Sequence, residues 1–251
     1  MNNKAILTNP PLVELVIGIQ FNNPIINNEL INKIYNSLFI SDFPKIEEKQ
    51  PIPSAIEEFN KPTITRILNG FHSRKLFISC DNNKLIQIQP DKILFNWRKV
   101  SNEDLYPRFN NVFQEFFTHL NKIEKLIKCK DEINQYEITY IDHFQLDLFN
   151  IVSYNLSKIF NVFTLKEELS SILISYSIPQ SLINGNLNMS FQSAIRSIDN
   201  KKIIAVESSC RGYKKEDTIN EWFKNSHDIL YDYFFSILTE ESKKILGYKN
   251  E

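Results

Sequence analysis

The feature that most constrains the fold is a change in hydrophobic period near Thr63. From there, apolar residues recur at alternate positions in four short segments, ITRILNGF, KLFISC, KLIQIQ and KILFNWRKV. Turn signals divide the segments at Asn69-Gly70, Asp81-Asn82-Asn83 and Pro90-Asp91. Because a period of two places alternate side chains on opposite faces, the pattern predicts an antiparallel meander.

The residues before the meander predict a strand and then a helix. Alternation from about Leu12 to Phe21 would put Val13, Leu15, Ile17 and Ile19 on one face of the strand. Apolar residues at helical spacing then predict an amphipathic helix that ends before Phe43-Pro44, and a loop rich in proline and acid is expected from Pro44 to Pro62. The apolar positions of this helix are Ile26, Leu30, Ile31, Ile34 and Leu38.

A long helix is expected after the meander, beginning at Tyr106-Pro107. It carries a wide apolar stripe of the kind that packs on a sheet. The stripe consists of Phe109, Val112, Phe113, Phe116, Leu120, Ile123 and Ile127.

The second half of the chain repeats this plan in outline. A strand is expected from Tyr136, alternating segments lie near Ser171 and from Leu187, and another strand follows the turn at Asp199-Asn200. A second long helix is expected from about Glu216, and Thr239 is predicted to cap a short last helix. The inward positions of the long helix are Ile219, Trp222, Phe223, Leu230, Tyr233, Phe234 and Ile237.

These patterns predict an α+β protein built from two related antiparallel β-sheet units, each with a long covering helix, as in a pseudo-duplication. The halves are residues 1–130 and 131–251, which we expect to form one compact unit. With 251 residues and 42% hydrophobic composition, the chain can bury a large core.

Composition narrows the partners that the chain can have. A formal net charge of −1 does not favour nucleic acid as a partner, and no apolar run has the length of about 20 residues that a membrane span needs. We therefore expect a cytoplasmic protein without membrane contact. Cys80, Cys129 and Cys210 form no CxxC pair and predict neither a disulfide framework nor a zinc site.

Motifs for cofactors and metals are not evident. The five glycines are isolated, so neither a P-loop nor a dinucleotide fingerprint can be drawn, and no cofactor is predicted. The histidines are scattered, and Asp142 and His143 should point to opposite faces of a strand, so we interpret them as structural and predict no metal site. A metal-dependent nuclease is a third-ranked function, because Pro90-Asp91 could supply a first acid but no Glu-x-Lys follows on a strand.

The segment KILFNWRKV supplies the candidate binding residues. Ile93, Phe95 and Trp97 should face the core, which leaves Asn96 and Arg98 on the other face. Asn96 and Arg98 could simply hold the end of the hairpin. Alternatively Arg98, Lys99 and Arg108 form a basic rim beside an exposed Asn96, which together could hold an acidic partner surface or a phosphate. Both interpretations stay open at the level of the sequence.

The chain resembles a family of uncharacterised prokaryotic proteins of similar length with a sporadic distribution. The resemblance spans nearly the whole chain, and its most specific part is the hairpin. It rests on Asn9-Pro10-Pro11-Leu12-Val13-Glu14, on Leu85 to Gln89 leading to Phe95-Asn96-Trp97-Arg98, on Tyr106-Pro107-Arg108-Phe109, on Tyr140-Ile141, and on the closing helix with His227, Phe234, Phe235 and Leu238-Thr239. Pro10 stands where the usual opening of the family has alanine. The resemblance implies no activity, cofactor or catalytic residue, and its sporadic occurrence suggests antiphage defence or toxin–antitoxin modules.

Good folding signals without a catalytic constellation favour a non-enzymatic binding component. The first hypothesis is protein–protein contact, with a partner encoded in the same operon or with a second copy in a homodimer, in an antiphage defence or toxin–antitoxin type system. The alternative is a sensor that binds a small ligand or nucleotide in a cavity between sheet and helix, with Arg98 and Arg108 at its mouth. A deep cavity ringed by these arginines would favour the sensor.

Overall fold

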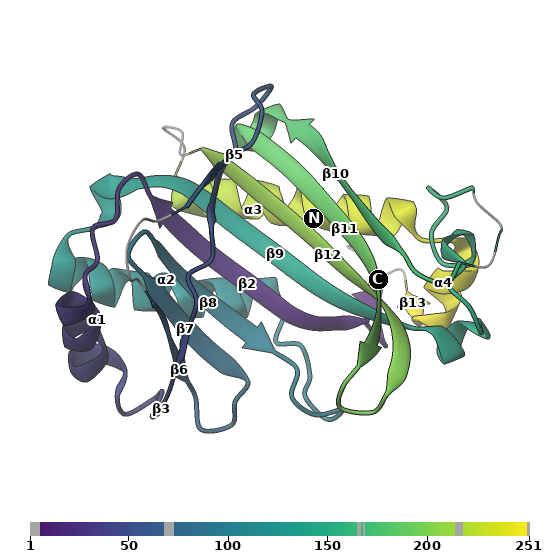
Figure 1. The fold of residues 1–251 in the computed structure, drawn as a ribbon, viewed down its shortest axis with the longest axis horizontal. Helices are drawn as coiled ribbons and strands as arrows, with labels where there is room; N and C mark the ends of the chain where they lie inside the picture. Colours follow the sequence, from purple (N-terminus) through teal and green to yellow (C-terminus); the bar gives the residue numbers. More distant parts are fainter. Residues whose placement is uncertain (1–5, 68–72, 165–166, 168, 214–217, 250–251) are drawn as a thin grey trace.

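In the computed structural model, which describes residues 6–67, 73–164, 167, 169–213 and 218–249, the chain folds around one antiparallel sheet of nine strands (Figure 1). The order across the sheet is β10-β11-β12-β9-β2-β8-β7-β6-β3. The strands are β2 (Leu12–Phe21), β3 (Lys45–Lys49), β6 (Arg74–Ile78), β7 (Lys84–Gln89), β8 (Lys92–Arg98), β9 (Ile133–Gln145), β10 (Leu173–Gln180), β11 (Gly185–Arg196) and β12 (Lys201–Tyr213).

The two halves of the chain meet at the centre of this sheet, where β2 pairs with β9. In each half the first strand lies beside the last, so that β2 is followed outward by β8, β7 and β6, and β9 by β12, β11 and β10. The α+β class with antiparallel pairing is confirmed. The two expected units are joined as one continuous sheet.

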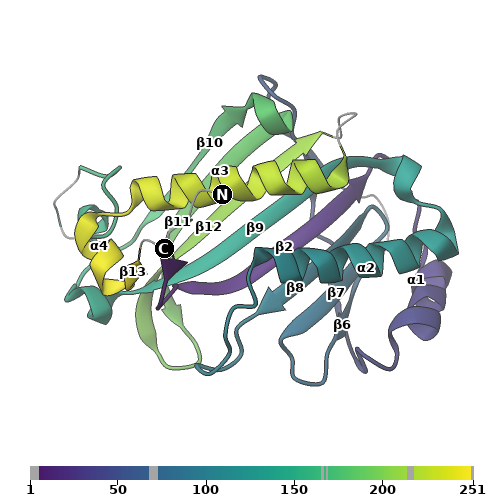
Figure 2. The same cartoon turned by 180° about the vertical axis from the view of Figure 1, so that it is seen from behind.

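Two long helices, α2 (Phe109–Ile127) and α3 (Ile219–Ile237), lie on the same face of the sheet (Figure 2). They run antiparallel, because Phe109 stacks on His227 at 4.2 Å while Phe116 meets Phe223, earlier in α3, at 5.7 Å. The predicted stripe of α2 is buried, apart from Ile127, which is only partly buried. Thr218 caps α3, whose expected start at Glu216 lies outside the described residues.

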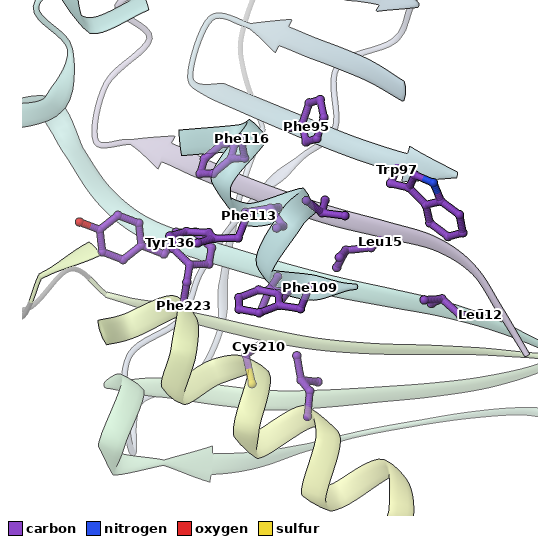
Figure 3. Packing of buried hydrophobic residues seen from close by; sticks show 14 of the residues in the cluster. Leu12, Leu15, Phe95, Trp97, Phe109, Phe113, Phe116, Tyr136, Cys210 and Phe223 are labelled. Atoms are coloured by element: carbon purple, nitrogen blue, oxygen red, sulfur yellow. The ribbon is translucent and has the colours of Figure 1, made fainter. Parts of the chain in front are cut away.

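The core between the helices and the sheet is rich in aromatic rings (Figure 3). Phe223 has no solvent exposure, and its ring lies 5.2 Å from that of Phe113 and 5.6 Å from that of Tyr136. Phe95 and Trp97 face this core from β8, as the alternation of that segment predicts. Phe223 therefore connects both helices with the centre of the sheet.

One detail of β2 differs from the prediction. Leu15, Ile17 and Ile19 are fully buried on the helix-covered face, but Val13 is only half-buried and Leu12 takes the core position instead. The cause is a register shift between Leu12 and Glu14 against β9, because a β-bulge reverses the alternation of the residues on one side of it.

The second face of the sheet is crossed by the segment after β3, which Figure 1 shows in front of the strands. The prediction of a loop from Pro44 to Pro62 was wrong, because the segment contains β3 and β4 (Ser54–Ile56). The prediction that ITRILNGF joins the meander was also wrong, since β5 (Ile64–Arg66) pairs with β4 in a separate sheet. The turn at Asn69-Gly70 lies outside the described residues.

Side-chain amides from the sheet hold this crossing segment. Gln89 bonds both the N–H and the carbonyl of Ile52 at 2.9 Å, and Gln135 accepts from the N–H of Glu57 at 2.8 Å and donates to the carbonyl of Ala55 at 2.6 Å. Each amide therefore replaces the hydrogen bonds that a neighbouring strand would make. The secondary-structure propensities of the segment's own residues do not predict these hydrogen bonds, because the partners lie far away in the sequence.

Shorter elements complete the fold. Helix α1 (Asn28–Ile34) continues as a π-helical turn, Tyr35–Phe39, and ends before Phe43 as expected. Thr239 caps α4 (Glu240–Ile245), and β1 (Ile6–Leu7) pairs with β13 (Tyr248–Lys249), so the two ends of the chain meet. The 3-10 turns are Lys130–Glu132, Leu146–Phe149, Leu156–Lys158 and Ser181–Ile183. Among the described residues, no helix combines the length and the apolarity that a membrane crossing requires.

Substitution of Phe223 tests this core. Phe223→Ala should lower the free energy of unfolding by about 3–5 kcal/mol, because it leaves a cavity between both helices and the sheet. Leu105→Ala, at a side chain that is 87% exposed, should change it by less than about 0.5 kcal/mol. Urea denaturation measures both values, and a similar loss in the two variants would contradict the packing described.

Candidate functional site

A cavity of about 410 Å³ lies on the helix-covered face of the sheet, at the N-terminal end of α2. Its apolar walls come from the N-terminal segment, from α3 and from the start of α2. They consist of Ile6, Leu7, Pro10, Pro11, Leu12, Phe109, Leu230, Phe234 and Phe235. Its polar lining is formed by Tyr106, Arg108, Asn110, Tyr140, Asp142, Ser208, His227 and Tyr231. The site therefore combines an apolar enclosure with a small group of polar side chains, as ligand sites commonly do.

The cavity exists because the two helices are offset. Phe109 begins α2 opposite His227, and α3 continues to Ile237 without α2 beside it. The chain termini cover part of the exposed space, since Ile6 and Leu7 of β1 line the cavity. The space beside α3 that neither α2 nor the terminal segments fill is the cavity.

Strand β9 provides two side chains to the cavity floor, Tyr140 and Asp142. The Tyr140 hydroxyl lies 2.8 Å from His227 Nδ1, and the His227 ring stacks on Phe109. These two contacts of His227 connect α3 to the sheet and to the start of α2. Burial raises the pKa of the Tyr140 and Tyr106 phenols, so both stay protonated at neutral pH. The Tyr106 hydroxyl is buried and makes no well-formed hydrogen bond to any described residue.

Asp142 is the most unusual group of the site. Its side chain is buried among the apolar residues that face the helices, and no hydrogen bond or ion pair joins it to another described side chain. Burial alone raises the pKa of this carboxyl to about 7. The neutral acid form of Asp142 is therefore favoured to a much higher pH than for an exposed aspartate.

Glu137, on the opposite face of the same strand, shows how a buried carboxylate is normally compensated. Burial by itself would raise its pKa, but Lys92 at 3.3 Å and Arg211 at 3.7 Å outweigh that effect and hold the pKa below its ordinary value. Arg211 also contacts the buried Glu57. No described cation compensates Asp142 in this way, so the two carboxyls of β9 have opposite environments.

Arg108 stands at the edge of the cavity, immediately before α2. Its backbone has φ 72° and ψ 152°, a region that residues other than glycine rarely adopt, and its side chain is exposed without capping the helix. The fold therefore holds this arginine at the start of α2 in spite of backbone strain. Such strain is often found at functional positions.

The other two predicted contact residues lie elsewhere. Asn96 is 2% exposed on the second face of the sheet, where it accepts from Gln87 at 2.8 Å and donates to Glu14 at 2.6 Å. Arg98 donates from Nε to the Asn82 carbonyl at 2.6 Å and does not line the cavity. The structure therefore places Asn96 and Arg98 together and separates Arg108 from them. The expected exposure of Asn96 is not found, because both ends of its amide are used internally.

The residues of the cavity floor were not predicted as contacts from the sequence. One signal could have found Asp142: it occupies the alternating row Tyr136, Ile138, Tyr140 and Phe144, in which every other side chain is apolar or aromatic. A carboxyl in such a row is costly unless it has a partner or a function. The expectation that Asp142 and His143 face opposite sides of the sheet agrees with their positions on β9.

Within the described residues, no three His, Cys, Asp or Glu side chains cluster in a way that could hold a metal ion. The three cysteines are free thiols, two of them buried.

No known family model matches this chain, and no curated protein is significantly similar to it. The family resemblance based on the hairpin stays a prediction.

The raised pKa of Asp142 predicts a pH-dependent stability. Because the folded pKa of about 7 exceeds the ordinary value of 3.8, the native state binds more protons than the unfolded state between those values, and its stability falls as pH rises through 7. Asp142→Asn should abolish this loss, which between pH 5 and pH 8 is on the order of 2–3 kcal/mol. Urea denaturation at pH 5 and pH 8 measures the difference between the wild type and the variant.

Asp131→Asn, at an exposed carboxyl in the turn before β9, is the matched control and should leave the pH dependence of stability unchanged. If the free energy difference between Asp142→Asn and the wild type were the same at both pH values, Asp142 would not be a desolvated acid.

Two substitutions of Arg108 isolate the effect of its backbone. Arg108→Gly and Arg108→Ala both remove the charge, but only glycine adopts φ 72° without strain. The glycine variant should therefore be more stable than the alanine variant by about 1 kcal/mol in thermal or urea unfolding. Equal stability would mean that the position is unstrained.

Proposed function

We propose that this protein binds a small organic molecule in the cavity between α2, α3 and the sheet. The observation that carries the proposal is Asp142, a buried carboxyl that faces the cavity without a hydrogen bond from the described residues. A buried polar group without a partner costs on the order of 1–3 kcal/mol. A ligand that completes its interactions would recover this free energy in the bound state, which supports a binding role.

The lining of the cavity supports a ligand with an apolar body and one polar end. Leu12, Leu230 and Phe234 enclose the apolar part, while Asp142 and Ser208 lie on the sheet side. A volume of about 410 Å³ falls within the usual range for small-molecule sites, about 300–1,000 Å³. Of the two arginines expected at the mouth of such a cavity, Arg108 lines it and Arg98 does not.

The hypothesis of a protein partner, encoded nearby or a second copy of the chain, remains a separate prediction. A sheet edge supports it: β10 pairs with β11 on one side, and no described strand pairs with its other side. Leu173 at the start of β10 is 74% exposed. Free strand edges can accept a strand from another chain. A role in antiphage defence or a toxin–antitoxin system also stays a prediction.

We further propose that the two halves arose by duplication of one unit. The similar arrangement of the two halves supports it. The elements β2, β6, β7, β8 and α2 occupy the same relative places as β9, β10, β11, β12 and α3. Superposition of residues 12–127 on residues 133–237 tests the idea. A superposition that fails to align β2 with β9 and α2 with α3 would contradict it.

Dye binding tests the proposed cavity. The neutral dye N-phenyl-1-naphthylamine, whose fluorescence rises out of water, should bind the full chain, and Asn110→Trp should weaken that binding about tenfold or more by filling the mouth. Asn110 is exposed and lines the cavity, so the substitution should spare the core.

Gln114→Trp places the same ring one helical turn further along α2, at an exposed position outside the cavity lining, and should leave dye affinity unchanged. Failure of the dye to bind, or equal affinity in the two variants, would contradict a ligand site at this place.

A further inference from the structure

The cavity has an aromatic wall, which we define as Tyr106, Phe109, Tyr140, Tyr231, Phe234 and Phe235. These rings come from the segment before α2, from α2 itself, from β9 and from α3, so they surround the space from several sides. Ring contacts between neighbours hold them in place, with Tyr231 and Phe235 at 4.7 Å and Phe234 and Phe235 at 5.6 Å. The faces of such rings carry negative potential and attract organic cations.

Among the described residues, Asp142 is the only carboxyl in the cavity lining, and it has no cationic partner there. Arg108 lines the same cavity, yet it forms no ion pair with Asp142. The two side chains belong to different elements, since Asp142 lies on β9 and Arg108 immediately precedes α2. A positive group at Asp142 would supply the compensation that Lys92 and Arg211 supply to Glu137.

We propose that the ligand is an organic ammonium compound whose cationic nitrogen lies between the aromatic wall and the Asp142 carboxylate. The assignment rests on the proposed function, since it names the ligand class of that same cavity. A metal cation fits less well, because hard cations prefer several carboxylate or carbonyl ligands, and among the described lining side chains Asp142 is the one carboxylate beside the hydroxyls of Tyr140 and Ser208. Arg108 at the edge disfavours a second positive group on the ligand, so the rest of the molecule is neutral or anionic.

The groups that face Asp142 are consistent with this ligand. Tyr140, on the same strand, and Tyr106, before α2, both remain neutral phenols and can accept a hydrogen bond from an ammonium group. Ser208 faces the cavity from β12, and His227 faces it from α3. Tyr140 and Ser208 pair directly across the strands, so the sheet presents three oxygen-bearing side chains side by side.

Three compounds of nearly equal shape provide the test: 2-phenylethylamine, 2-phenylethanol and phenylacetate. Each is titrated into the full chain at pH 8, where Asp142 is mostly ionised, by calorimetry and by displacement of N-phenyl-1-naphthylamine. The amine should bind roughly tenfold to a hundredfold more tightly than the alcohol, and phenylacetate should bind most weakly.

Asp142→Asn should bring the amine to the affinity of the alcohol while the alcohol still binds, which shows that the cavity is intact. Asp131→Asn, with its exposed carboxyl, should keep the preference for the amine. If the amine binds no better than the alcohol to a protein that still binds the dye, the ammonium assignment is overturned and the ligand site stands. If the dye does not bind either, both proposals fail.

Discussion

Pairing between β2 and β9 is the constraint on which the rest of the fold depends. These strands belong to different halves of the chain, yet they lie side by side at the centre of the sheet, with Ile17 opposite Ile138. β2 is also paired with β8 on its other edge, so its backbone is hydrogen-bonded on both sides, and Leu15, Ile17 and Ile19 have no solvent exposure. The two half-sheets form one surface, and α2 and α3 lie on the same face of it and pack against each other through rings such as Phe113 and Phe223.

The cavity follows from this arrangement. The strands of the two halves extend further than the paired part of the helices, and α2 begins only where Phe109 meets His227. The space beside the rest of α3 is enclosed by short segments from both chain ends, which pack less completely than a helix would. Strand β9 passes under this space and places Asp142 in it, whereas Glu137 of the same strand faces Lys92 and Arg211 on the other side. Two carboxylates five positions apart therefore have opposite electrostatic environments.

Local pattern predicted the elements that depend on hydrophobic period. β2 begins and ends at the predicted residues, the stripe of α2 is buried almost as expected, and Thr239 caps the last helix. The local pattern gave wrong predictions where side chains that are distant in the sequence decide the structure. The segment from Pro44 to Pro62 looks like a loop because its prolines and acids dominate, yet β4 forms there because Gln135 and Gln89 bond the segment containing it. The half-buried state of Val13 depends on a bulge against a strand more than a hundred residues away in the sequence.

The sequence by itself determined which faces of the strands and helices are apolar, because alternation and helical spacing are properties of consecutive residues. It also determined that Trp97 belongs to the core while Asn96 and Arg98 face the other side. Only the tertiary structure decided that Arg108 lines a cavity and that Asp142 lies in its floor without a compensating charge from the residues that the structure describes. The burial and the electrostatic environment of a side chain depend on residues that are distant in the chain, and the pairing of β2 with β9 and the offset of the two helices bring those residues together.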